Sequence, residues 1–236
     1  YIEIIGSGWD KTKVTSIANK KSNLSQDAKS GDNYVVLVDA SGFKTGQYIA
    51  ITDDTKKGDG HYGSDLGYCY KITNVVGDTV YIDGTLGVDF NVSDNAYAVN
   101  IWNIFTINNA SAKVVFKDLQ IDGNIDNKYY IYPSYTTDPL AGNGESYGEN
   151  GIIAIQADMI KCENVYIHDM RIHGIAIRNT NRYCVYNCKI SGVSDKSILL
   201  RDSGDGIISR NYIFSIWKRL INTPNPLNFI NSIFYQ

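Results

Sequence analysis

The sequence predicts an all-β protein in which a small barrel- or sandwich-like domain precedes a solenoid of stacked coils. Three observations lead to this prediction. Short apolar strands alternate with turn residues, little of the chain has helical periodicity, and one eleven-residue pattern occurs three times in the second half. The composition agrees, with 18 tyrosines against 4 prolines in 236 residues. A hydrophobic fraction of 43% is enough to bury a core.

Residues 25–100 contain short strands separated by turn signals, as in "NYVVLVDASGF", "GQYIAITDD" and "YCYKITNVVGDTVYIDGTL". Such short, regular spacing is typical of a small barrel or sandwich. The insertion "DDTKKGDGHYGSDLG" carries Asp53, Asp54, Asp59 and Asp65, and carboxylate oxygens are ligands that calcium prefers. Because the spacing does not match an EF-hand loop, a calcium site and a solvated hairpin tip are both open here.

From about residue 101 the sequence becomes repetitive. The stretches "VVFKDLQIDGN" from Val114, "VYIHDMRIHGI" from Val165 and "YCVYNCKISGV" from Tyr183 share one pattern. Each reads apolar, any, apolar, any, Asp or Asn, apolar, any, Ile, polar, Gly. The segments "IAIQ", "IAIR" and "ILLR" begin at residues 153, 175 and 198, so the period is 22 to 23 residues. A loop at 124–150 interrupts the repeat.

We expect each repeat to form short strands that bend at the Asp or Asn, because these residues tolerate left-handed backbone. One repeat cannot bury its apolar side alone, so neighbouring coils must supply the core. The expected bend residues are Asp118, Asp169, Asn187 and Asn211. The expected inward residues are Val114, Phe116, Leu119, Ile121, Val165, Ile167, Met170, Ile172, Tyr183, Val185, Cys188 and Ile190.

Coils of this length, the Asp/Asn bends and "IDGN" followed by a variable loop resemble the right-handed parallel β-helix of the pectate-lyase superfamily. That superfamily includes polygalacturonase-like hydrolases and phage tailspike depolymerases, as well as epimerases and non-catalytic adhesins. The resemblance covers residues 101–215. It implies a right-handed single-stranded parallel β-helix that acts on or binds a polysaccharide. The polygalacturonase-like pattern "DDCIAI" is matched only in part by "SDKSILL", where Asp195 is followed by Lys196.

The shared pattern places Asp122 and His173 in one slot of adjacent coils, with Ser191 in the next coil. A glycosidase needs two carboxyl groups about 5–5.5 Å apart for retention or about 6.5–9.5 Å apart for inversion. Asp122 and Asp195 are candidates, and Glu149 or Glu145 on the loop could serve as partner. A lyase needs a base and a cation, which His173 and nearby Lys and Arg residues could supply. Turn residues and surface histidines of the same kinds are also common without any function.

Binding residues are expected on the loop and on two equivalent strands. The loop carries Tyr129, Tyr130, Tyr132, Tyr135 and Tyr147. Tyrosine rings suit sugar C–H groups and hydroxyls, although they could equally cover the side of the coils or an oligomer contact. Arg178 and Arg201 follow equivalent strands and would suit an acidic sugar, unless they only pair with neighbouring aspartates.

The expected organisation is an N-terminal segment at 1–24, a small β domain at 25–100, the β-helix at 101–215 and an irregular C-terminal segment at 216–236. Since the repeat ends without a polar cap, either more chain follows or another subunit covers the end; the resemblance to tailspikes favours a homotrimer.

The net charge of −3 gives no electrostatic indication of nucleic-acid binding, and no apolar run is long enough for membrane insertion. The resemblance implies an extracellular or virion-surface polysaccharide hydrolase or lyase, and we expect it to need no cofactor, calcium apart. The alternative is a non-catalytic glycan-binding adhesin or tail-fibre segment.

Overall fold

The computed structural model describes residues 1–56, 66–129, 131–133, 149–193, 195–214 and 234–235. The chain divides into two compact units, one formed by residues 1–17, 103–126 and 149–236 and the other by 18–102 and 127–148. The fold is all-β, as predicted, and helical structure in the described residues is confined to short 3₁₀ turns. None of the described helices is long and apolar enough to cross a membrane.

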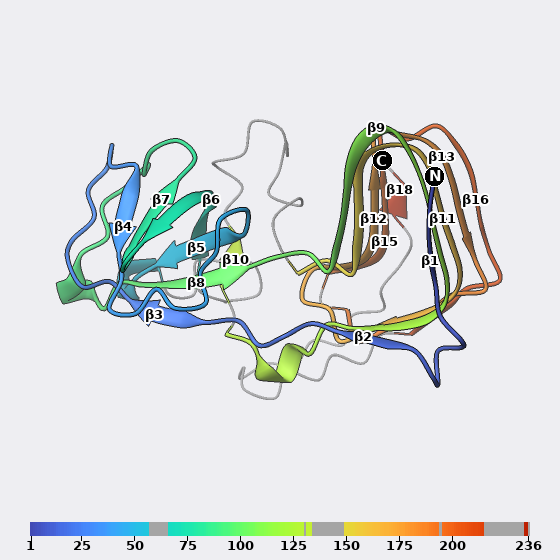
Figure 1. The fold of residues 1–236 in the computed structure, drawn as a ribbon, viewed down its shortest axis with the longest axis horizontal. Coiled ribbons are helices and arrows are strands. Elements are labelled where there is room, and N and C mark those ends of the chain that lie inside the picture. The colour runs from blue at the N-terminus through green and yellow to red at the C-terminus, as the bar shows by residue number, and fades with distance from the viewer. Residues whose placement is uncertain (57–65, 130, 134–148, 194, 215–233, 236) are drawn as a thin grey trace. The chain divides into compact units, whose positions relative to one another are not determined.

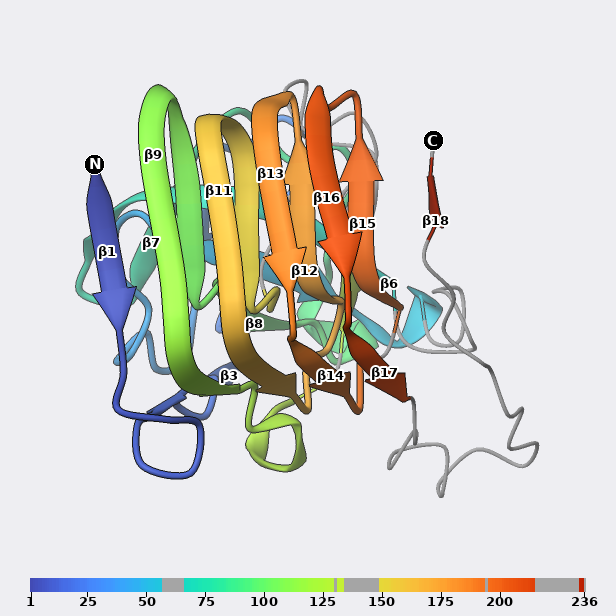
Figure 2. The ribbon, with the colours of Figure 1, turned by 90° about the vertical axis from the view of Figure 1, so that its right-hand side faces the viewer.

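The first unit is built from parallel strands (Figure 1). Its strands are β1 (Ile2–Ile5), β2 (Lys13–Thr15), β9 (Phe105–Asp122), β11 (Ile152–His168), β12 (His173–Arg178), β13 (Thr180–Tyr186), β14 (Lys189–Ser191), β15 (Lys196–Arg201), β16 (Asp205–Ser209), β17 (Tyr212–Phe214) and β18 (Phe234–Tyr235). Figure 2 shows β1, β9, β11, β13 and β16 side by side, each from a successive turn of the chain.

Successive turns of the chain stack in three ladders of paired strands. The first ladder joins the beginnings of β9 and β11 with β12, β15 and β18. The second joins β1, the middles of β9 and β11, β13 and β16. The third joins β2, the ends of β9 and β11, β14 and β17. Ile152 pairs with Ile175 and Ile175 with Ile198, so the repeat is 23 residues in both steps.

The core of the first unit consists of side chains that alternate inward along these ladders. Phe116, Leu119, Ile121, Ile167 and Ile190 are all buried in one cluster. The inward positions expected from the repeat are therefore confirmed, apart from Tyr183, which is only partly buried, and Ile172, which is buried outside this cluster.

The bends between the second and third ladders are made by left-handed residues. Asp118, Asn164, Asn187 and Arg210 have φ between 52° and 56°. Asn164 Nδ2 donates to Asp118 Oδ1 at 2.8 Å, and Asn187 Nδ2 donates to Asn164 Oδ1 at 2.5 Å. The predicted bend ladder is thus confirmed at Asp118 and Asn187, whereas Asn164 occupies the place expected for Asp169.

Residues 1–17 belong to the first unit, although the sequence suggested a separate N-terminal segment. Ile2 pairs with Val114, and Val14 pairs with Ile121, so this segment forms a further turn beside β9. The second unit is inserted after this turn. Its chain range, 18–102 with 127–148, also takes in most of the expected loop.

The second unit is a sheet of mainly antiparallel strands in the order β3-β8-β5-β6-β7-β4. A bridge between Leu24 and Leu37 joins the two ends of this order, around a core that includes Ile49, Ile72 and Phe90. Its elements are β3 (Lys21–Asn23), β4 (Tyr34–Val36), β5 (Tyr48–Thr52), η1 (Asp54–Lys56), β6 (Leu66–Val76), β7 (Thr79–Ile82), η3 (Val92–Asp94), β8 (Tyr97–Ile101) and β10 (Tyr132–Pro133). The remaining 3₁₀ turn, η4 (Ile125–Asn127), lies where the chain passes from the first unit to the second.

Candidate functional site

The third ladder stacks Asp122, His168 and Ser191 in one column, because Asp122 pairs with His168 and His168 with Ser191. The expectation that Asp122 and His173 share a slot is wrong. His173 lies in the first ladder, opposite Lys196. The same pattern of apolar residues followed by Asp or Asn occurs at two successive corners of one coil. The sequence alignment therefore matched Val165 with Val114 and Tyr183, whereas the structure pairs Ile160, five residues earlier, with both.

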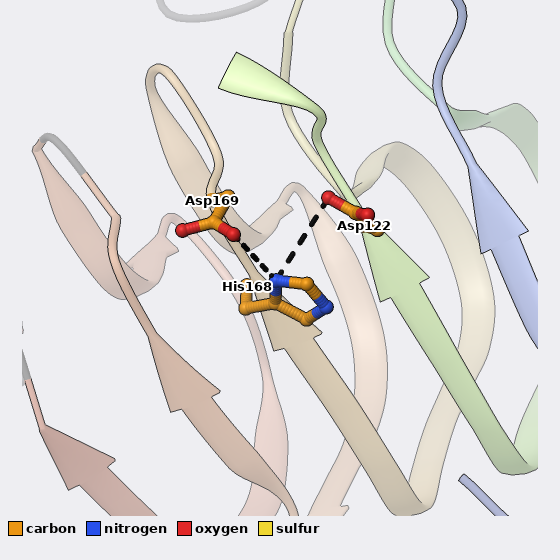
Figure 3. A group of neighbouring side chains, drawn as sticks. All are labelled: Asp122, His168 and Asp169. Atoms are coloured by element: carbon orange, nitrogen blue, oxygen red, sulfur yellow. Dashed lines mark hydrogen bonds and ion pairs between the residues drawn. The ribbon is translucent and has the colours of Figure 1, made fainter. Parts of the chain in front are cut away.

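Asp122 and His168 form a compact polar group with Asp169, which follows His168 in the chain (Figure 3). The imidazole lies between the two carboxylates, with Nδ1 2.8 Å from Asp169 Oδ2 and 3.8 Å from Asp122 Oδ1. The Asp122 and His168 side chains are each 12% exposed, and that of Asp169 is 23% exposed. The group is therefore partly desolvated but open to a ligand. We call it the His168 cluster.

Neighbouring groups fix the orientation of this cluster. Lys13 Nζ lies 2.6 Å from Asp122 Oδ2, and the backbone N–H of Asn124 donates to Asp122 Oδ1 at 2.8 Å. Gln120 Nε2 lies 2.6 Å from His168 Nε2. With the Gln120 amide donating to Nε2, the neutral imidazole carries its proton on Nδ1 and donates it to Asp169. A carboxylate that accepts from Nδ1 holds the ring in place, as in acid–base sites.

The corner after the third ladder gives the Asp169 carboxylate its space. Gly123, Asp169 and Gly192 directly follow the stacked residues of this column, so only the middle position has a side chain. A Cβ added to Gly192 would lie 2.7 Å from Asp169 Oδ1, and Gly192 has a φ of +60°. The carboxylate thus occupies room that a side chain at residue 192 would fill.

Aromatic rings continue the surface of the third ladder. The Tyr166 ring lies 4.7 Å from the His168 ring and meets Trp9 edge-on at 6.1 Å. Lys189 Nζ lies 4.5 Å from the centre of the Tyr166 ring, and Phe214 is exposed beyond it. The half-buried Tyr166 ring and the exposed Trp9 ring suit a carbohydrate, whose C–H faces stack on rings and whose hydroxyls need acceptors such as the nearby carboxylates.

His173 lies in a different environment. Its side chain is fully buried, and burial lowers the pKa of the imidazole from 6.5 to about 4, although Asp195 opposes this shift. Nδ1 accepts from the backbone N–H of Lys196 at 3.4 Å and is 3.8 Å from Asp195 Oδ2. The Asp195 carboxylate pairs with Lys196 Nζ at 3.1 Å. This arrangement keeps His173 neutral and inside the coil.

Glu149 is likewise buried, with a left-handed φ of 74°. Its Oε2 lies 2.8 Å from Nη1 of Arg171, and both side chains are at most 3% exposed. Glu149 and Arg171 thus form a buried ion pair, an arrangement that is typical of a structural role. Its predicted catalytic role stays a prediction.

The predicted binding residues are distributed over both units. Arg178 is buried and pairs in register with Arg201, which is partly exposed and 3.6 Å from Asp202. Tyr129 is exposed in the second unit, where its backbone is held by the Asn19 amide. Tyr132 lies in β10, without a described side chain, and the other predicted tyrosines, Tyr130, Tyr135 and Tyr147, lie outside the described residues, as does Glu145.

Of the four aspartates proposed for calcium, Asp59 and Asp65 also lie outside the described residues. Asp53 is buried, and its carboxylate binds Lys56 Nζ at 2.7 Å and the backbone N–H of Thr55. Asp54 accepts from the Asn95 amide at 2.7 Å. These contacts account for the two described aspartates within the second unit itself.

The sequence interpretation missed His168, Asp169, Gln120 and the two rings of Trp9 and Tyr166. One signal could have found His168 and its neighbours in the third ladder: "FKD", "CEN" and "VYN" each end in a bend residue. Aligning Asp118, Asn164 and Asn187 puts His168 between Asp122 and Ser191. Trp9 carries no such signal, because its segment lies outside the repeat.

The chain matches no protein-family model. It is 26% identical over 172 residues to a curated depolymerase described as capsule K1-specific, from Klebsiella phage K64-1. The match covers 72% of this chain and 15% of that protein, so the chain spans about a seventh of the relative's length.

Solved phage tailspikes are also similar to the chain. The gp61 tailspike of Pseudomonas phage phi297 is 15% identical with a TM-score of 0.32, over 87% of this chain and 36% of that chain. The Gp54 tailspike of Acinetobacter baumannii bacteriophage AP22, solved in complex with an A. baumannii capsular saccharide, is 11% identical with a TM-score of 0.31, over 87% and 50%. The gp49 tailspike of Pseudomonas phage LKA1 is 12% identical with a TM-score of 0.32, over 84% and 46%.

Proposed function

We propose that this chain is part of a virion-associated protein that acts on a bacterial surface polysaccharide, with the glycan bound on the third ladder. The observation that carries the proposal is the His168 cluster, where two carboxylates and an imidazole lie beside Trp9 and Tyr166. The similarity to a capsule-specific phage depolymerase supports the same substrate class. Virion-surface or extracellular localisation follows from this proposal.

The finer architecture belongs to the same proposal. The 23-residue repeat and the parallel ladders support a right-handed single-stranded parallel β-helix. The bridge between Leu24 and Leu37 supports a small closed barrel for the second unit. A homotrimer, which the resemblance to tailspikes implies, also belongs to this proposal.

Two chemistries are compatible with the cluster. One carboxylate oxygen of Asp122 and one of Asp169 lie within 4.8 Å of each other, so the two carboxyl groups are near enough for a retaining glycosidase, which needs about 5–5.5 Å, and too near for an inverting one. Asp195 lies in the coil of Ser191, which is two coils away from Asp122, or about 10 Å along the stack. Asp195 is therefore a poorer second carboxyl group for Asp122 than Asp169 is. For a lyase, His168 held by Asp169 would serve as the base and Lys13 or Lys189 as the cation.

A non-catalytic glycan-binding role is the second candidate, and one observation favours it. The Asp122 carboxylate is already bound by Lys13 Nζ and by the backbone of Asn124. A carboxylate held in this way by an ammonium and a backbone N–H can still accept hydrogen bonds from sugar hydroxyls, which is all that a binding site requires.

A panel of purified bacterial capsular polysaccharides tests the proposal. New reducing ends without ultraviolet absorbance indicate hydrolysis, reducing ends with the absorbance of an unsaturated sugar indicate a lyase, and saturable binding without products indicates an adhesin. His168→Ala should lower kcat/KM about a hundredfold or more, as expected for loss of an acid–base group. Asp158→Asn, a change at a partly exposed residue of β11 that pairs with Lys113 and Arg182 and not with the cluster, should leave kcat/KM unchanged. Neither cleavage nor binding of any capsular polysaccharide would refute the proposal.

A further inference from the structure

The donor atoms of the His168 cluster lie where a metal ion would need them. Asp122 Oδ1, His168 Nδ1 and a carboxylate oxygen of Asp169 lie within 4.8 Å of one another, and they come from two successive coils. We propose that they bind a divalent transition-metal ion of the zinc class. Nothing in this inference depends on whether the protein cleaves a glycan.

The distances fit such an ion. Zinc takes nitrogen and oxygen ligands at about 2.0–2.2 Å in a tetrahedron, which separates neighbouring ligand atoms by about 3.3–3.5 Å. His168 Nδ1 lies 2.8 Å from Asp169 Oδ2 and 3.8 Å from Asp122 Oδ1, so the observed pairs bracket that separation. One imidazole with two carboxylates favours zinc, manganese or cobalt over calcium, which prefers six to eight oxygens.

The surrounding groups can support a bound ion. Metal binding requires Nδ1 to lose its proton, so the imidazole must then donate from Nε2. Gln120 already contacts Nε2 at 2.6 Å, and turning its amide over presents Oε1 as the acceptor. Asp122 keeps Lys13 on Oδ2, while Oδ1 accepts one backbone N–H and has a second lone pair for the ion.

The corner glycines are an independent indication. The side chain of Asp169 stands between Gly123 and Gly192 of the adjacent coils, and a Cβ at residue 192 would press on its carboxylate at 2.7 Å. The corner therefore leaves this carboxylate the space to turn toward His168. An ion held there would tie β9 to β11 and keep its remaining coordination position toward solvent, near Tyr166.

Metal binding can be measured directly on the full chain after chelator treatment, with Co²⁺ and Zn²⁺ as probes. We expect one equivalent of Co²⁺ to bind with visible d–d absorption and to be displaced by Zn²⁺. His168→Ala and Asp169→Asn should each weaken Zn²⁺ binding by about a hundredfold or more, whereas Asp158→Asn should have no effect. The chain has three histidines, so the His168 variant keeps two as internal controls.

Lys13→Gln gives the opposite test, because it removes the cation that competes for Asp122. Zn²⁺ affinity should rise in this variant. Far-UV circular dichroism of each variant checks that it is folded. Millimolar or weaker Zn²⁺ binding by the wild type, or equal affinity in folded His168→Ala, would overturn the metal site. Glycan binding by the metal-free protein is a separate readout and survives that outcome if the proposed function is correct.

Discussion

Two histidines of the first unit lie next to aspartates at corners of the coil stack, yet their environments are opposite. His173 is fully buried, its Nδ1 accepts a backbone N–H, and burial lowers its pKa to about 4. His168 is partly exposed, lies 2.8 Å from Asp169 and packs beside the Tyr166 ring. The sequence pattern pointed to the first, whereas the geometry favours the second.

The comparison teaches that a polar residue before a turn carries little information until its burial is known. His173 itself is fully buried, and the ion pair between Glu149 and Arg171, two residues before it, is buried as well. Around His168 the partners are surface groups such as Lys13. The first region should therefore govern stability, and the second should govern binding. Substitutions in the two regions should therefore differ in their effect on the free energy of unfolding.

Arg171→Ala should lower the free energy of unfolding by about 3–5 kcal/mol, because it leaves the Glu149 carboxylate buried without this guanidinium. Urea unfolding followed by circular dichroism measures the change. The double variant Glu149→Gln/Arg171→Met should recover most of the loss, since no uncompensated charge remains. A loss below about 1 kcal/mol for Arg171→Ala would show that the pair does not hold this corner.

Acidification should destabilise the protein through His173. Its pKa is 6.5 when exposed and about 4 when folded, so the unfolded state binds the proton first as the pH falls. The stability contribution is complete above pH 6.5 and lost by pH 4, a total of about 3 kcal/mol at 1.36 kcal/mol per pKa unit. Urea titrations give the free energy of unfolding at pH 7 and at pH 4. The difference between these two free energies should be about 3 kcal/mol larger in the wild type than in His173→Gln. Identical pH dependence in both proteins contradicts the assignment.

Asn164→Ala should cost about 2 kcal/mol. Asparagine tolerates the left-handed φ of 53° at this position better than alanine does. The substitution also removes the side-chain hydrogen bonds to Asp118 and Asn187. Asn164→Gly keeps the backbone conformation accessible and should cost about half as much. Thermal unfolding distinguishes the two. If alanine is tolerated better than glycine, the bend does not depend on left-handed backbone.

Lys13→Gln should change stability by less than about 1 kcal/mol, because the lysine is 48% exposed and surface ion pairs contribute little. The contrast with Arg171→Ala is the informative quantity, and the same urea titration provides it. A loss of 3 kcal/mol or more would mean that the His168 cluster is itself a structural element.

Much of the core could be predicted from the sequence because alternation alone determines which side chains point inward. Phe116, Ile121 and Ile167 were placed correctly even though one stretch was out of step. A shift of five residues moves the pattern from one corner to the next and preserves the inward set. The same symmetry concealed His168, since adjacent corners look alike until Asn164 is recognised as a bend.

Other features could not be predicted for physical reasons. Ile152 faces the core, but Ile153 is also buried in a separate apolar cluster, so the first ladder lacks the alternation that would fix its register. This explains the one-residue difference between the expected step of 22 and the observed 23. The turn formed by residues 1–17 pairs with strands more than 100 residues away and contains no copy of the repeat.

The proposed function requires that the glycan contacts His168 and not His173. With ¹³C-labelled histidine, the imidazole signals can be assigned from His168→Ala and His173→Gln. They can then be followed while the capsular polysaccharide selected by the panel is added as a short oligosaccharide. We expect the His168 signal to shift or broaden at saturating ligand while the His173 signal stays unchanged. A shift confined to His173 would show that the glycan does not bind at the His168 cluster.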